Sequence, residues 1–316
     1  MKTGRTWWVL IGLLAVEAIV FGTWGRNFGT ADNVANMVRH GTEVALLALA
    51  LLPVVVGGGI DLSLGSMVGL SAVVFGKAWR DGGMPWGGAA LIAVATGAGA
   101  GCLNGWMVVR LRVPSLIVTL GTYSLFRGMA EALTQGVDAF TAFPASFLWL
   151  GEGRWGGVPV QGWILAAATV AAASWMHGMR WGRELRAAGF APEGARHAGI
   201  DVGRRLVWAH GACGLVAGIA GLGYTARLGT AKADAGTGLE LAAITAVVLG
   251  GASIHGGRGS VGGTWLGIAV IAVMANGLTR LPATMSVAAE LTGLMTGLLL
   301  LGGMALGPLL RKDGGS

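Results

Sequence analysis

Long apolar runs alternate with short polar connections along almost the whole chain. Ten runs carry few or no charged residues; in order they are 7–24, 44–60, 62–76, 86–109, 113–126, 155–176, 206–226, 241–254, 259–279 and 291–310. A membrane-spanning helix needs about 20 predominantly apolar residues, and several runs are shorter than this. The pattern predicts an all-α fold, a polytopic transmembrane helical bundle of about ten spans, with residues 1–316 as a single transmembrane domain.

Composition supports a membrane protein. The chain is 54% hydrophobic and 12% charged, whereas a soluble domain carries about 25% charged residues. Glycine is abundant, with 58 residues, and often recurs every fourth position inside the apolar runs. Small residues at this spacing favour close helix packing in lipid, although a codon bias toward glycine is an alternative. The spaced sets are Gly97/Gly101/Gly105, Gly65/Gly69, Gly214/Gly218, Gly263/Gly267 and Gly293/Gly297.

The basic residues predict a topology. Lys2 and Arg5 precede the first run, six arginines lie in the loop 180–205, and Arg311 and Lys312 follow the last run. Positive charge concentrates on the cytoplasmic side of membrane proteins. We therefore expect a multi-pass membrane protein with both termini in the cytoplasm. Topology and contact with membrane lipid account for the net charge of +7, so no nucleic-acid partner is expected.

The stretch "PVVVGGGIDLSLGSMVGL", residues 53–70, interrupts an apolar run with three glycines and Asp61. A broken helix leaves backbone groups unpaired, which costs several kcal/mol per group in lipid. Asp61 or Ser63 can cap the helix that restarts near Leu62. Asp61 can instead line a polar passage, and the two roles are compatible.

A similar break occurs in the second half of the chain. Residues 54–66 read "VVVGGGIDLSLGS" and residues 247–260 read "VVLGGASIHGGRGS". Matched glycine interruptions in two halves point to a transport pathway; chance similarity is the alternative, because glycine is common here. The sequence thus predicts glycine-interrupted helices and an internal repeat. The predicted pathway residues are Gly57, Gly58, Gly59, Asp61, Ser63, Gly65, Ser66, Gly250, Gly251, Ser253 and Ser260.

Several catalytic and ligand motifs are excluded. "GASIHGGR" approaches a phosphate-binding loop, but Gly257 stands where that loop needs lysine. The five histidines show no metal-ligand spacing, and no catalytic constellation is present. We therefore expect a non-enzymatic chain without a metal or cofactor of its own. The acidic residues Glu17, Glu43, Glu131, Glu240 and Glu290 lie in or near predicted spans, most of them near span ends, which favours solvated or capping roles over proton or sodium sites.

One hydrophilic segment predicts a partner site. In "GFAPEGARHAGI" Pro192 suits a first helical turn, Glu193 suits its positive end, and Gly199 suits its stop. The segment is a plain connection, or a short helix that seats in a groove of a soluble partner. The docking helix would comprise Pro192, Glu193, Ala195, Arg196, His197 and Gly199.

Four stretches together resemble the ribose-type sugar permeases of bacterial ATP-binding cassette importers. They are "GGGIDLSLGS", "VPSLIVTLGTYSLFRGMAEALTQG", "GRELRAAGFAPEGARHAGIDV" and "GTGLELAAITAVVLGGASIHGGRGSVGGTWLG". The resemblance covers residues 30 to 305. It implies a dimeric membrane core, of two copies or two related permeases, with a separate cassette ATPase that binds ATP and a periplasmic sugar-binding protein.

The resemblance also assigns roles within the chain. It places 192–199 at the helix that couples the ATPase to the passage. Two positions depart from the family: Ala191 replaces a polar cap, and His197 replaces an apolar residue. Family substrates include ribose, rhamnose and autoinducer-2. An ion-coupled secondary transporter with internal repeats is the alternative function, and a passive channel or scaffold is a third.

Overall fold

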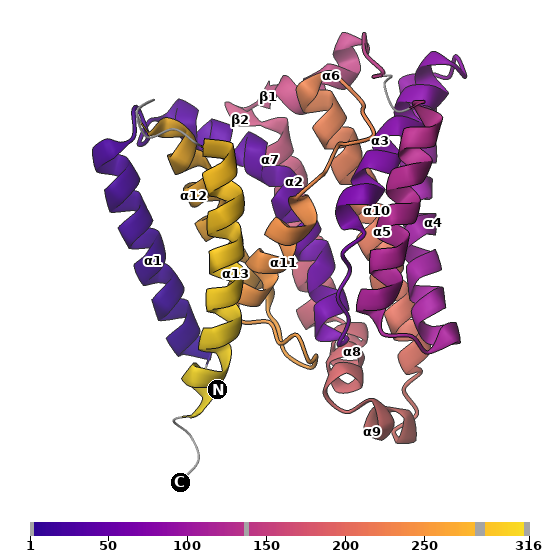
Figure 1. The fold of residues 1–316 in the computed structure, drawn as a ribbon, viewed down its shortest axis with the longest axis vertical. Helices are drawn as coiled ribbons and strands as arrows, with labels where there is room; N and C mark the ends of the chain where they lie inside the picture. Colours follow the sequence, from indigo (N-terminus) through magenta and orange to yellow (C-terminus); the bar gives the residue numbers. More distant parts are fainter. Residues whose placement is uncertain (1–2, 136–138, 282–287, 313–316) are drawn as a thin grey trace.

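The computed structural model describes residues 3–135, 139–281 and 288–312, with side chains described for 6–135, 139–281 and 291–305. The elements in these ranges are α1 (Thr3–Trp24), α2 (Ala31–Val56), α3 (Leu64–Arg80), α4 (Trp86–Leu111), α5 (Ser115–Leu133), α6 (Ala145–Glu152), β1 (Arg154–Trp155), β2 (Val158–Pro159), α7 (Val160–Ala173), α8 (Arg180–Phe190), α9 (Pro192–His197), α10 (Val202–Leu228), α11 (Leu239–Leu249), α12 (Val261–Arg280) and α13 (Ala288–Lys312). A single π-helical turn, Ser174–Gly178, follows α7. Figure 1 shows the long helices side by side as one bundle.

The helical membrane fold predicted from the sequence is confirmed. Each of the ten apolar runs overlaps one of the helices α1, α2, α3, α4, α5, α7, α10, α11, α12 and α13, and the run 155–176 also includes most of the β1–β2 hairpin. Among the described residues, five helices are long and apolar enough to cross a membrane, namely α1, α2, α4, α10 and α12. This is fewer than the ten spans expected. Interruptions of the chain leave α3 with 17 residues and α11 with 11, both below the typical span length of about 20 residues.

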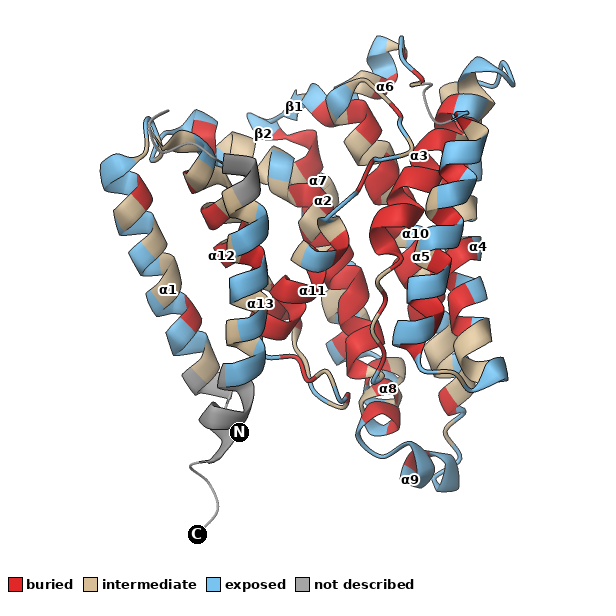
Figure 2. Ribbon diagram, viewed as in Figure 1, coloured by how far each residue is buried: buried red, intermediate tan, exposed pale blue. Residues whose placement is uncertain are grey.

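Close backbone contact joins α4 to α10. A Cβ added at Gly97 would overlap the carbonyl of Gly214, and one added at Gly101 would overlap that of His210. Figure 2 shows buried residues concentrated on α2, α3 and α10. The predicted role of spaced glycines in packing is therefore confirmed for these helices. It stays a prediction for Gly293 and Gly297 on α13, where an added Cβ would meet no neighbour within 4 Å among the described residues.

The two ends of the bundle differ. At one end lie α6 and the β1–β2 hairpin, in which Trp155 pairs with Val158; Phe147 of α6 packs on Phe75 with ring centroids 4.5 Å apart. At the other end lie α8 and α9, where α1 begins and α13 ends (Figure 1). The first and last helix ends therefore share a side with the loop 180–205, as the charge pattern predicts; the cytoplasmic assignment of that side stays a prediction.

Candidate functional site

The first glycine break begins at the end of α2. Gly57 is the C-cap, and Gly58 adopts a φ of +87°, which favours glycine. The Gly58 and Gly59 amides donate 2.9 Å hydrogen bonds to the carbonyls of Val55 and Val54. This pattern is a Schellman turn, which satisfies the last carbonyls of a helix. Non-helical backbone follows until α3 begins at Leu64.

The second break repeats this turn at the end of α11. Gly250 is the C-cap, Gly251 has a φ of +88°, and its amide donates a 2.9 Å hydrogen bond to the carbonyl of Val248. The Ala252 amide donates to Val247 at 3.2 Å. Each bond occupies the position equivalent to one in the first break. The similar stretches 54–66 and 247–260 therefore form the same backbone turn at the end of a helix in both halves of the chain.

The copies differ where the next helix starts. Ser260 caps α12 as predicted, because its hydroxyl accepts a 3.1 Å hydrogen bond from the Gly263 amide. Ser66 lies inside α3, and its hydroxyl donates to the carbonyl of Ser63 at 2.8 Å. Ser63 is the N-cap residue of α3 but makes no side-chain cap. The expectation that Ser63 caps this helix is therefore wrong.

The two breaks touch each other beside α8. The Gly257 amide donates a 2.8 Å hydrogen bond to the carbonyl of Val56. Gly189, near the end of α8, lies against both partners: an added Cβ would overlap the Val56 oxygen and lie 2.7 Å from the Gly257 nitrogen. At Gly256 an added Cβ would lie 2.9 Å from the Cα of Gly58. We call these five residues the glycine junction.

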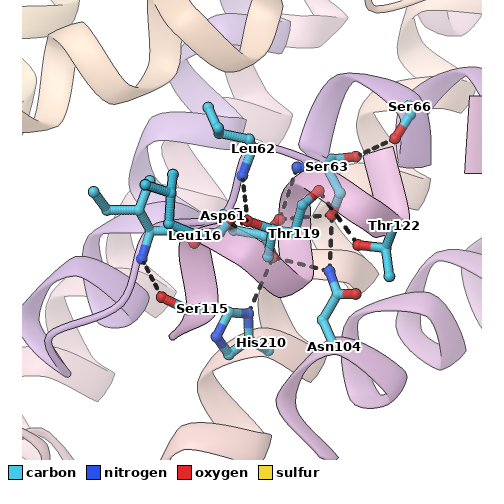
Figure 3. Close-up of polar contacts among 11 residues, drawn as sticks. Asp61, Leu62, Ser63, Ser66, Asn104, Ser115, Leu116, Thr119, Thr122 and His210 are labelled. Atoms are coloured by element: carbon cyan, nitrogen blue, oxygen red, sulfur yellow. Dashed lines mark hydrogen bonds and ion pairs between the residues drawn. The ribbon is translucent and has the colours of Figure 1, made fainter. Parts of the chain in front are cut away.

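Asp61 lies at the centre of a buried polar cluster (Figure 3). Its Oδ1 accepts hydrogen bonds from the Ser63 amide at 2.9 Å and the Ser63 hydroxyl at 2.6 Å. Its Oδ2 lies 3.0 Å from Nδ1 of His210 and 3.4 Å from Nδ2 of Asn104. All four residues are 0% exposed. Asp61 therefore orders the chain just before α3 rather than capping α3 itself.

Hydroxyl groups of α5 satisfy the backbone of the interrupted segment. The Ile60 amide donates to Ser115 Oγ at 2.9 Å, and the Leu62 amide donates to Thr119 Oγ1 at 3.2 Å. The Thr119 hydroxyl also contacts the Ile60 carbonyl at 3.2 Å. These bonds explain how backbone without helical pairing is tolerated inside the bundle. Sequence reasoning missed Asn104, Ser115, Thr119 and His210; the available signal was a polar side chain within an apolar run.

A further interruption, not predicted from the sequence, precedes α11. Residues 229–238 form turns and irregular backbone, and the N-terminus of α11 lies against the N-terminus of α3. A Cβ added at Gly65 would overlap Glu240 Oε2 and lie 2.5 Å from the Gly236 carbonyl. Glu240 Oε1 accepts a 3.1 Å hydrogen bond from the Gly238 amide. Glu240 thus binds the amide of the N-cap residue of its own helix and is 7% exposed, so the solvated role expected as one alternative does not apply.

Arg127 of α5 holds the non-helical segment 229–238 in place. Its Nη1 donates hydrogen bonds to the carbonyls of Ala233 and Ala235, the latter at 3.2 Å. The same nitrogen would lie 2.8 Å from a Cβ added at Gly69 on α3. One helix, α5, thus holds two non-helical segments, the one that follows α2 and the one that precedes α11. The first is held through Ser115 and Thr119, and the second through Arg127.

Comparison with known proteins gives the family. The family described as "Branched-chain amino acid transport system / permease component" matches residues 33–304. The chain belongs to this permease family. The permease is similar to the ribose import permease protein RbsC of Escherichia coli (strain K12), with 38% identity over 279 residues, which cover 86% of this chain and 85% of RbsC. It is also similar to the autoinducer 2 import system permease protein LsrD of that strain, with 31% identity over 289 residues, covering 90% and 87% of the two chains. No solved structure matches.

The permease carries the predicted short helix as α9. Pro192 stands at the first position of α9, and Glu193 lies in its first turn. Gly199, with a φ of +78°, follows it. Ala191 provides no side-chain cap. The helix and its boundaries are confirmed; its role as an ATPase-docking element stays a prediction.

The two faces of α9 differ. Ala195 is 5% exposed and packs with Ala188 and Val202. Arg196 and Glu193 form an ion pair of 3.6 Å, in which their side chains stay 61% and 89% exposed. Such an exposed pair contributes little to stability, about 0–1 kcal/mol. The charged face of α9 is therefore available to a partner.

The predicted pathway residues differ in burial: Gly59 and Gly250 are buried, and Gly57 and Ser260 are half-buried. Asp61, Ser63, Gly65 and Ser66 are buried within the chain, and Ser253 is 7% exposed. Gly58 and Gly251 are exposed at the two turns. The structure brings Gly58 close to the second break through Gly256, and it keeps Asp61 inside the bundle. The role of these residues in translocation stays a prediction.

Proposed function

We propose that the chain is the membrane-spanning permease subunit of a bacterial sugar importer. It would move ribose, rhamnose, autoinducer-2 or a similar monosaccharide across the inner membrane, driven by ATP that a separate subunit hydrolyses. Family membership and the similarity to a ribose permease and an autoinducer 2 permease support this proposal. Both termini and the loop 180–205 would face the cytoplasm.

The observation that carries the proposal is the path from α9 to the glycine junction. The helix α9 follows directly after α8, whose Gly189 lies against Val56 of the first break and Gly257 of the second. A soluble ATPase that grips α9 and α8 can therefore move both breaks at once. Phe190, 73% exposed between Gly189 and α9, adds an apolar anchor for such a partner.

The remaining partners follow from what the chain would need. A periplasmic sugar-binding protein would deliver substrate, and a second permease, identical or related, would complete the membrane core. The loop 251–258 resembles a phosphate-binding motif but lacks its lysine, which supports the proposal that a separate subunit hydrolyses ATP. In this loop Gly257 binds the Val56 carbonyl and Gly256 lies against Gly189, so its backbone is engaged in packing within the chain.

Reconstitution tests the proposal. The permease is placed in liposomes with its cassette ATPase and sugar-binding protein, and uptake of radiolabelled ribose, rhamnose and autoinducer-2 is measured with and without ATP. We expect uptake of one sugar that requires all three proteins and ATP. Uptake by the permease alone, driven by a proton or sodium gradient, would establish the secondary transporter instead. Gradient-independent leakage by the permease alone would establish a channel.

A further inference from the structure

The turn before α11, residues 234–238, is partly exposed although it lies within the length of the helical bundle. Asp234, Thr237 and Gly238 are exposed, while Ala235 and Gly236 between them are buried. The turn is closed locally: the Thr237 amide donates to the Asp234 carbonyl at 3.2 Å, and its hydroxyl donates to the same carbonyl at 2.7 Å. Figure 1 shows this connection crossing the middle of the view between α10 and α11.

Positions along the long helix α10 show how deep in the bundle the turn 234–238 lies. His210, which contacts Asp61, lies about one third of the way along α10, and Gly221, which packs on Val68, lies about three quarters of the way along. Gly65 falls between Asp61 and Val68 and meets Gly236. The head of α11 therefore lies near the middle of the bundle, far from either membrane surface.

Lipid is an unsuitable neighbour for this turn. Non-helical backbone at membrane depth is tolerated only where protein buries it or where it lines a water-filled cavity. This chain leaves Thr237 and Gly238 exposed. Half-helix ends near the midplane also mark substrate sites in other transporters. The exposed turn therefore requires water or a second protein chain as its neighbour, and the polar side chains beside it favour water.

A polar stripe of α5 borders the same turn. Tyr123, Arg127 and Glu131 follow one another at intervals of four residues, which places them on one face of α5. The Arg127 guanidinium lies 6.0 Å from the centre of the Tyr123 ring and binds the carbonyls of Ala233 and Ala235. By contrast, the large exposed side chains of α4 before its last turn, which holds Arg110, are apolar and include Leu91, 74% exposed, and Trp106, as lipid contact requires.

A separate cavity fits a sugar less well. It holds about 550 Å³ between α2, α12 and α13. Its walls are mainly apolar, with Met37, Ile268 and Ile271 among them. Three of its polar residues already have partners: Asn276 exchanges hydrogen bonds with Asn33, His40 contacts Arg227, and the Thr279 hydroxyl donates to the Asn276 carbonyl. A polyhydroxylated ligand needs more hydrogen-bond partners than these walls offer.

We infer that the turn 234–238 and the Tyr123–Arg127–Glu131 stripe form one wall of a water-filled passage and contact the sugar there. The inference rests on the proposed function. The ligand class is a neutral polyhydroxylated sugar, whose hydroxyls can bond with the Thr237 hydroxyl and the backbone of the turn, and whose ring can lie against Tyr123. The contact surface is thus distinct from the buried Asp61 cluster.

Cysteine labelling in membrane vesicles tests the wall. Thr237→Cys and Tyr123→Cys are made in a Cys102→Ala background, because Cys102 is exposed and Cys213 is buried, and each is treated with a charged, water-soluble thiol reagent. We expect both to react about tenfold faster than Leu91→Cys on α4, because only a hydrated thiol ionises readily. Sugar, supplied with the binding protein, should slow both reactions severalfold.

The outcomes are separable from those of the uptake assay. Labelling of both variants as slow as Leu91→Cys overturns the wall, as does rapid disulfide formation between two Thr237→Cys chains without reagent labelling, since a copy would then cover the turn. Rapid labelling that sugar does not slow overturns the sugar contact. If labelling is fast and sugar-sensitive while ATP-driven uptake is absent, the wall stands and the ATP-driven importer falls.

Discussion

The amide of Gly257 donates a 2.8 Å hydrogen bond to the carbonyl of Val56, so the two equivalent breaks of the repeat meet at one point. Gly189 lies against both residues. Because α9 begins two residues after the end of α8, any movement of α9 is transmitted to this contact over a very short distance. The junction is therefore where we expect coupling to be most sensitive to side-chain volume.

Gly189→Ala is predicted to uncouple the transporter. The added Cβ would overlap the Val56 carbonyl, and backbone atoms on both sides leave it no room. Overpacking of this kind costs about 1–3 kcal/mol, which here would separate the two breaks from α8. We expect reconstituted ATP hydrolysis to persist while sugar uptake falls about tenfold or more, given about 1.4 kcal/mol per factor of ten.

Gly194→Ala is the matched control for this change. Gly194 lies in α9, where an added Cβ would meet only the Cβ of Ala191, at an ordinary 3.7 Å. Uptake and hydrolysis should stay at the wild-type ratio. A normal ratio of uptake to hydrolysis in Gly189→Ala, in folded protein, would show that the junction does not carry coupling.

Asp61→Asn is predicted to destabilise the fold rather than block a passage. The carboxylate is fully buried and lies 3.0 Å from His210 Nδ1, and removing one partner of a buried pair costs about 3–5 kcal/mol. Thermal unfolding of purified protein in detergent should shift down clearly for Asp61→Asn and for His210→Asn. The double variant should lose less than the sum of the two, because the pair is lost only once. Additive losses would show that the two side chains do not interact.

Local signals in the sequence were sufficient for the helices and their glycine turns. Gly57 and Gly250 follow aliphatic runs, and Pro192 opens α9; each is a local preference of the backbone that tertiary structure keeps. The spaced glycines of α4 and α10 were equally readable, because close approach of two backbones needs small residues.

The composition of the polar cluster depended on contacts between distant residues. Asp61 and His210 are 149 positions apart, and no local rule pairs them. The interruption before α11 was missed for a related reason: 229–238 contains polar residues that are compatible with an ordinary loop. Only the packing of Gly236 against Gly65 places it at mid-depth.

Stability is predicted to fall at acidic pH through His177. This residue lies just beyond the 155–176 run, in the π-helical turn, and its Nδ1 lies 3.1 Å from the Arg186 guanidinium. Burial, followed by the positive charge of Arg186, lowers the pKa of His177 from its ordinary value of 6.5. The unfolded chain therefore binds a proton at His177 more readily than the folded chain does. This difference reduces stability as pH falls below 6.5.

His177→Asn provides the measurement for this group. Its Oδ1 can still accept from Arg186, but it does not titrate. The drop in thermal unfolding midpoint between pH 7 and pH 5 should be smaller in this variant than in the wild type. An equal drop in both proteins would assign the acid sensitivity to other groups.

The double variant Glu193→Gln, Arg196→Glu is predicted to weaken ATPase binding without changing stability. Both side chains are mostly exposed and their ion pair is long, at 3.6 Å, so the unfolding midpoint should stay near the wild-type value. If α9 seats in a groove of the ATPase, reversing its charge should lower the affinity about tenfold, or about 1.4 kcal/mol. Co-purification and titration of ATP hydrolysis measure this affinity.

Arg154→Glu is the control, because Arg154 forms a similarly exposed pair with Asp32, 3.3 Å long, at the opposite end of the bundle. Equal ATPase affinity in both variants and the wild type would leave α9 as a plain connection.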